Sequence, residues 1–130
     1  MKTQSIISNF EKGNTYLTKA TVSNNEKLWN PHPKFPGVSL KHLITGEQTS
    51  NRFSSHIVRI DPGCVLDEHI HEGKTELHEI IEGSGICQLD GIEIHYLPGD
   101  SAVIPDDTKH KVTAGENGLM IYAKFIPALL

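Results

Sequence analysis

The chain has 130 residues, with 16 acidic and 12 basic side chains and a formal net charge of −4. This length predicts one domain with a single hydrophobic core. The charges are interspersed and form no basic stripe, so we expect no nucleic-acid partner. No apolar run approaches the roughly 20 residues of a membrane helix, and the opening MKTQSIISNF is not typical of a signal peptide. We therefore expect a cytoplasmic protein that has no membrane partner.

The first 37 residues are predicted to form an N-terminal arm ahead of the main domain. Its beginning is polar, with two weak strand candidates at Gln4–Ile7 and Tyr16–Val22. The segment WNPHPKFPG has three prolines in nine residues. Because proline fixes φ and removes a hydrogen-bond donor, we expect an extended arm here rather than a paired strand or a helix.

Two large apolar side chains of this arm, Trp29 and Phe35, need cover from the barrel or from a second subunit. We favour the second subunit, and so expect a homodimer with residues 1–37 at its interface. His32 lies between prolines and is expected to be a surface histidine.

From residue 38 to 130, β signals dominate. Val38–Ile44 alternates, with Val38, Leu40 and His42 on one face, and FSSHIVRI reads as a strand that ends at Asp61-Pro62-Gly63. His56 on that strand is either a polar group in a cavity or a satisfied core histidine. Asp90-Gly91 between two β-rich runs predicts a hairpin, and turn signals recur every 8–12 residues. This spacing favours an all-β sandwich or barrel over residues 38–130.

The two cysteines, Cys64 and Cys87, lie 23 positions apart without a CxxC spacing. In a reducing cytoplasm, such scattered thiols are usually free, and we expect no disulfide.

The stretch from Gly63 to Gly83 carries the densest group of metal-ligating residue types. In an extended strand His69 and His71 point to the same face, roughly 7 Å apart at about 3.3 Å per residue. A polar turn follows at residues 72–75, and we expect the next run, ELHEII, to return beside the first strand. Glu76 would then lie opposite the two histidines. Two histidines and one carboxylate are a recurring ligand set for transition metals.

Two spaced motifs in this region resemble those of the cupin superfamily. The first, G-x5-H-x-H-x3,4-E-x6-G, is matched by Gly63, His69, His71, Glu76 and Gly83. The second, G-x5-P-x-G-x2-H-x3-N, is matched by Gly99, Pro105 and His110. It departs at Asp107 and Ala114, which affect a turn and a structural position but no ligand.

The resemblance implies a double-sheet jelly-roll β-barrel, frequent homodimers and one divalent metal per chain. It implies the ligands His69, His71, Glu76 and His110. Such a set suits Fe, Mn, Ni, Zn or Cu.

His78, two residues after Glu76, shares its strand face and is the candidate catalytic acid or base, with a structural role as the alternative. Whether Cys87, His95 and Tyr122 face the cavity stays open at this stage.

Two classes of function follow. The first is a metal-dependent enzyme acting on a small organic acid or sugar-like substrate, as a dioxygenase, isomerase, lyase or decarboxylase. The second is a non-catalytic module that binds a small ligand or a metal. The complete ligand set favours the enzyme, although fold alone does not fix function.

Overall fold

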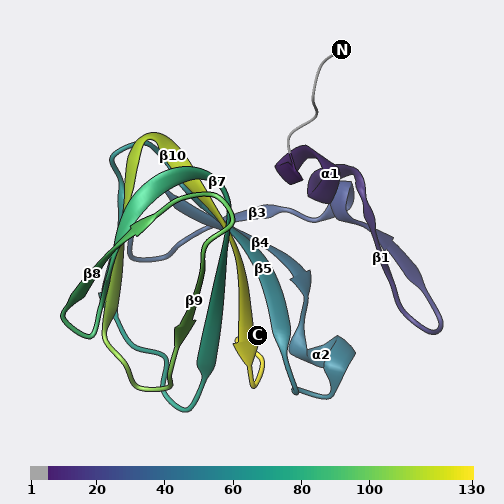
Figure 1. Cartoon of the computed structure of the whole chain (residues 1–130). Helices are drawn as coiled ribbons and strands as arrows, with labels where there is room; N and C mark the ends of the chain where they lie inside the picture. Colours follow the sequence, from purple (N-terminus) through teal and green to yellow (C-terminus); the bar gives the residue numbers. More distant parts are fainter. Residues whose placement is uncertain (1–5) are drawn as a thin grey trace.

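The computed structural model describes residues 6–130, and strands dominate them (Figure 1). The elements in chain order are α1 (Ile6–Lys12), β1 (Asn14–Tyr16), β2 (Thr21–Ser23), the 3₁₀ turn η1 (Asn24–Glu26), β3 (Trp29–Pro31), β4 (Val38–Ile44), α2 (Gly46–Thr49), β5 (Ser54–Ile60), β6 (Val65–His69), β7 (Thr75–Leu89), β8 (Ile92–Tyr96), β9 (Ser101–Ile104) and β10 (His110–Ile126). The predicted all-β jelly roll is confirmed. Among the described residues, no helix is long and apolar enough to cross a membrane.

Two long strands, β7 and β10, run through both layers of the jelly roll. The first half of β7 pairs with the second half of β10. These two halves belong to a first layer with the strand order β3-β4-β5-β10-β7-β9. The second half of β7 pairs with the first half of β10, and these halves belong to a second layer with the strand order β6-β10-β7-β8. The two layers are therefore continuous through the bends of β7 and β10 (Figure 1).

The bend depends on two glycines that face each other. The register of β7 against β10 shifts between Ala114 and Leu119, where Gly83 pairs with Leu119. Gly83 and Gly118 have φ values of +83° and +77°, in the left-handed region that L side chains rarely adopt. A Cβ on Gly83 would also collide with the carbonyl oxygen of Gly118. The last glycine of the first motif thus lets the two strands approach closely where they change layer.

Alternation along the strands divides the apolar residues between the interior and one outer face. Inside, Val38, Val58 and Ile121 belong to the main core. Outside, Leu43 and Ile57 form a second cluster with Ile7 of α1, which covers this face of the first layer. Val38, Leu40 and His42, which were predicted to share one face, all face the interior.

The N-terminal region is more structured than the sequence suggested. The strand candidate at Gln4–Ile7 lies partly outside the described residues, and its end begins α1. The candidate at Tyr16–Val22 spans the turn of the β1–β2 hairpin. The Pro-rich segment was expected to be unpaired, but Trp29–Pro31 pairs with β4. Proline is tolerated there because β3 is an edge strand. The division at residue 37 stays a prediction.

Trp29 and Phe35 have partners within the chain. The Trp29 ring stacks under the Arg59 guanidinium, 4.2 Å from the ring centroid, and packs with the outer cluster. Phe35 packs against the main core and stacks on His32 at 4.6 Å. Both rings are therefore covered within the chain, and the homodimer stays a prediction.

The close approach at Gly83 predicts a large loss of stability for Gly83→Ala. Gly91 is a matched control because its φ is +82° and a Cβ there would meet nothing within 4 Å. Gly91→Ala should lower the free energy of unfolding by about 1–2 kcal/mol through backbone strain alone. Gly83→Ala should lower it by at least about 3 kcal/mol more, because the backbone must also move. Urea unfolding measures both, and equal losses would contradict the role given to the close approach.

Candidate metal centre

The candidate ligands converge from both layers across the interior. His69 ends β6, His71 lies in the connection that follows, Glu76 is on β7 and His110 begins β10. The predicted hairpin between the two halves of the first motif is wrong. β6 pairs with β10, with His69 opposite His110, whereas the first half of β7 belongs to the other layer. The β6–β7 connection therefore crosses between layers, and this crossing brings Glu76 to the histidines.

Three histidines form a group that can hold a metal ion. His69, His71 and His110 each offer one ring nitrogen, and the three nitrogens lie within 4.8 Å of one another. His69 Nδ1 donates to the carbonyl oxygen of Asp67 at 2.6 Å, and His110 Nδ1 donates to that of Thr108 at 3.0 Å. These bonds orient both rings and leave each Nε2 with a free lone pair, as metal-binding histidines require.

The carboxylate of Glu76 completes the site. Its Oε1 lies 3.2 Å from His110 Nε2 and 3.6 Å from His71 Nε2. The angles at the shorter contact are not those of a hydrogen bond, and Glu76 Oε1 and His110 Nε2 are buried atoms without a hydrogen-bond partner. Such orphaned atoms are rare in folded proteins. A divalent ion beside them would satisfy both, so the residues present fit a metal.

The ionisation states of Glu76, His69 and His71 suit a metal. A protonated His110, in contrast, must give up the proton on its Nε2 when it binds an ion. Burial and the neighbouring His110 lower the pKa of His69 to about 4, and burial lowers that of His71. Burial would raise the pKa of Glu76, but its contacts with His78, His110 and His71 outweigh burial and lower it. For His110 the contact with Glu76 outweighs burial and raises its pKa. At neutral pH, Glu76 is thus a carboxylate, and His69 and His71 are neutral ligands.

His78 lies behind Glu76 rather than on the cavity wall. Its Nε2 is 3.1 Å from Glu76 Oε2 and its Nδ1 is 3.0 Å from the Tyr96 hydroxyl. Burial raises the pKa of Tyr96, so its O–H is intact and donates to Nδ1. His78 then donates from Nε2 to the carboxylate. Direct contact of His78 with a substrate, as its strand face suggested, is not what the structure provides, because both ring nitrogens are already bonded.

The ligands open onto a cavity of about 300 Å³ in the main barrel. His69, His71 and Glu76 lie on its wall, together with apolar side chains such as Leu40, Leu66 and Phe125. Its remaining polar groups include Asn30, His32 and His42. The arrangement is a candidate metal site at one wall of a small and mostly apolar chamber.

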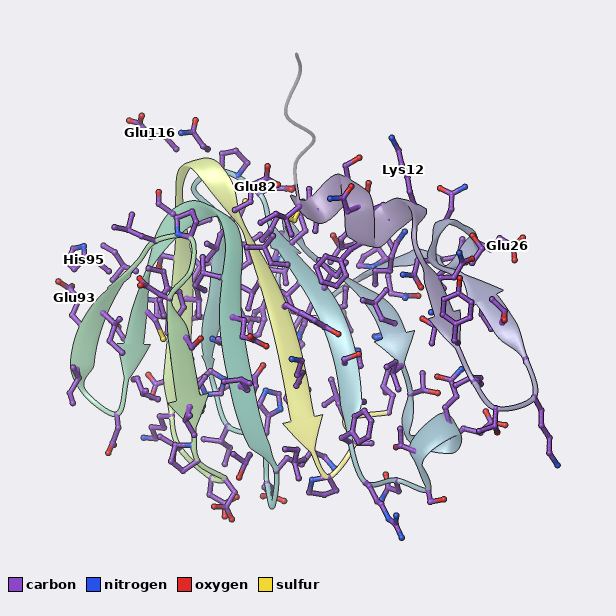
Figure 2. All side chains as sticks on the ribbon, turned by 45° about the vertical axis from the view of Figure 1, so that its right-hand side comes forward. Lys12, Glu26, Glu82, Glu93, His95 and Glu116 are labelled. Atoms are coloured by element: carbon purple, nitrogen blue, oxygen red, sulfur yellow. The ribbon has the colours of Figure 1, made fainter. Side chains whose placement is uncertain are left out.

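The other candidate residues lie in the core, at the outer face and on the cavity wall. Cys87 is buried in the main core, Tyr122 packs on Phe10 at the outer face, and both cysteines are free as expected. His95 is exposed, beside Glu93 (Figure 2). His32 is partly exposed, as expected of a surface histidine, but it also lies on the wall of the cavity, which the sequence did not suggest. Nothing in the sequence marked residues 129–130, which also line the cavity.

His56 is fully buried and belongs to a hydrogen-bonded group. Its Nδ1 lies 2.7 Å from His42 Nδ1, and its Nε2 lies 2.8 Å from Ser54 Oγ. Burial and the neighbouring His42 lower the pKa of His56 from 6.5 to about 4. His56 is therefore a satisfied core histidine and does not line the cavity, although it contacts His42, which does.

This pKa predicts a loss of stability in acid. Below about pH 6.5 the unfolded chain takes up a proton on His56, whereas the folded chain does so only near pH 4. The contribution of His56 to stability is thus present above pH 6.5 and is lost as the pH falls to about 4, by roughly 3 kcal/mol at most. Urea unfolding of chelator-treated protein should show a steeper decline for the natural chain than for His56→Gln. Parallel pH profiles would contradict it.

Comparison with known proteins agrees with this geometry. The family model described as "Cupin domain" matches residues 56–122. A dimethylsulfoniopropionate lyase, DddW, of Ruegeria pomeroyi is 32% identical over 97 residues, which are 74% of this chain and 63% of the lyase. An oxalate-binding protein of Thermotoga maritima is 21% identical over 78% of this chain and 85% of that protein. The solved structure of KdgF from Halomonas sp. superposes with a TM-score of 0.70 at 26% identity, covering 80% of this chain and 89% of KdgF. With a family model that matches more than half of its length and a jelly roll like those of solved cupins, the chain belongs to the cupin domain family.

Proposed function

We propose that this protein is a metal-dependent enzyme acting on a small organic acid, with lyase chemistry as the favoured reaction class. The observation that carries the proposal is the convergence of three histidine nitrogens and a buried carboxylate, of which His69, His71 and Glu76 line a mostly apolar cavity. The similarity to a lyase favours that class among those the ligand set permits, although the chain spans only 63% of that relative's length.

His69, His71, His110 and Glu76 would hold the ion, and a divalent ion so held would supply Lewis-acid polarisation of a substrate oxygen. His78 and Tyr96 hold Glu76 in place from behind. The mostly apolar walls lower the local dielectric constant, which strengthens electrostatic contacts between the ion and a bound acid. The cavity volume of about 300 Å³ lies at the lower end of the range for small-molecule sites, which favours a small substrate.

A non-catalytic binding protein is the second candidate. The position of His78 favours it, because both ring nitrogens of His78 are bonded and neither is free to act as an acid or base on a substrate. The similarity to an oxalate-binding protein supports it as well. Binding of a small acid without turnover would decide for this candidate.

The metal proposal predicts that His69→Ala/His71→Ala loses the ion but keeps the fold. The barrel has its own apolar core, and the two replaced side chains lie on the cavity wall. Protein purified without added metal should contain about one divalent ion per chain, and the double variant almost none. Elemental analysis measures this, followed by screening of small organic acids for turnover, under air and under nitrogen. His95→Ala, an exposed histidine, is the control, and full metal occupancy in the double variant would exclude these ligands.

The bonding of His78 predicts that it supports metal binding. His78→Gln should raise the metal dissociation constant about 10- to 100-fold, because Glu76 Oε2 loses a well-aligned donor. Tyr96→Phe should act in the same direction but less, since it removes only the outer hydrogen bond. Competition with a fluorescent chelator measures the constants. If His78→Gln instead lowers the turnover of a small organic acid substrate and leaves the metal affinity unchanged, His78 acts as a catalytic acid or base.

A further inference from the structure

A second group of polar side chains reaches the same cavity from another strand pair. His42 on β4 stands opposite His56 on β5, and their Nδ1 atoms are 2.7 Å apart. His42 lines the cavity, whereas His56 is fully buried and contacts the edge of Phe125. Neither residue belongs to the metal ligands or to the groups that hold them.

The hydroxyl of Ser54 determines where the protons of this pair lie. Ser54 Oγ accepts the backbone N–H of Leu129 at 2.8 Å and lies 2.8 Å from His56 Nε2. Ser54 is fully buried, and its O–H has no other acceptor within the described part of the chain. A buried hydroxyl left without an acceptor costs about 1–3 kcal/mol. Ser54 therefore donates to His56 Nε2.

The remaining protons follow from this first bond. With Nε2 as an acceptor, neutral His56 carries its proton on Nδ1 and donates it to His42 Nδ1. His42 must then carry its own proton on Nε2, on the far side of its ring. No residue of the described chain accepts a hydrogen bond from this N–H, and burial lowers the pKa of both histidines, so the pair is neutral at pH 7. His42 is thus an uncharged donor on the cavity wall.

We propose that His42 is a ligand-binding residue that donates its Nε2–H to an uncharged oxygen acceptor of the substrate, while an acid group of the same molecule occupies the metal centre. The chemical class is a small organic acid that carries a second oxygen, as a ketone or a comparable acceptor. His56 and Ser54 are positioning residues that fix the tautomer of His42. This inference rests on the proposed function, because it assumes that the acid binds at the metal.

The tautomers can be measured without any ligand. Two-bond ¹H–¹⁵N correlation spectra of the ¹⁵N-labelled, zinc-loaded protein distinguish a ring protonated on Nδ1 from one protonated on Nε2. At pH 7 we expect His42 on Nε2 and His56 on Nδ1, with the signals assigned from His42→Phe and His56→Gln. The opposite pair of tautomers would overturn the inference whatever the substrate is.

Ligand selectivity tests the same residue in the assembled site. The probes are 4-oxopentanoate and 5-oxohexanoate, with pentanoate and hexanoate as matched acids that lack the ketone. In calorimetric titrations of zinc-loaded protein, at least one keto acid should bind about tenfold more tightly than its matched acid. His42→Phe, which keeps a ring of similar area, should abolish this preference while zinc content and affinity for the plain acid stay unchanged. Ser54→Ala removes the hydrogen bond that fixes the tautomers of His56 and His42, and it should weaken the preference severalfold. This variant tests the proposal if His42→Phe does not fold.

The outcomes separate the two hypotheses. Equal binding of keto and plain acids by the natural chain, or a preference that survives in both variants, would overturn the role of His42 and leave the proposed function standing. If neither kind of acid binds the zinc-loaded protein, the small-acid proposal fails, and the inference fails with it. His95→Phe is the matched control, since this exposed histidine contacts only Glu93 and should leave the preference intact.

Discussion

The buried carboxylate of Glu76 is the constraint on which the rest of the site depends. An ionised carboxylate inside an apolar barrel is strongly unfavourable unless its oxygens are bonded or paired. One oxygen receives the N–H of His78, and the other faces His71 and His110 without a hydrogen bond. Protein groups thus satisfy only half of this carboxylate. The oxygen without a hydrogen bond is a second observation, beside the histidine group, that fits a divalent ion at this point.

This arrangement requires ligands from two layers to meet at one point. His69 and His110 come from the second layer, and Glu76 comes from the first. Because β7 and β10 belong to both layers, the close approach of Gly83 to Gly118 lies where the two layers join, and both layers contribute candidate ligands. The glycine that ends the first motif has a geometric function, since no side chain fits where the strands change layer.

Much of this could be predicted from the sequence, because strands and turns follow from local chemistry. The faces of Val38–Ile44 could be predicted from side-chain alternation, and the Asp90-Gly91 hairpin from turn preference. The pairing partners of β6 and β7 could not be predicted, because a short turn between two strands does not reveal that β10 takes the place beside β6. Nor could the position of His78 behind Glu76 be predicted, since a shared strand face does not say which side chain reaches the cavity.

The charges of the cavity bear on which acids the proposed site would accept. Three neutral imidazoles and one carboxylate leave a divalent ion with one net positive charge, which favours an anionic ligand group in an apolar chamber. The His42–His56 pair is neutral, and the burial that lowers the pKa of His56 opposes its protonation. A second anion at His42 would therefore lose its hydration without gaining a charged partner. In this proposal the two polar regions of the cavity wall differ in charge, so a ligand with one acid group and one uncharged acceptor fits in a single orientation.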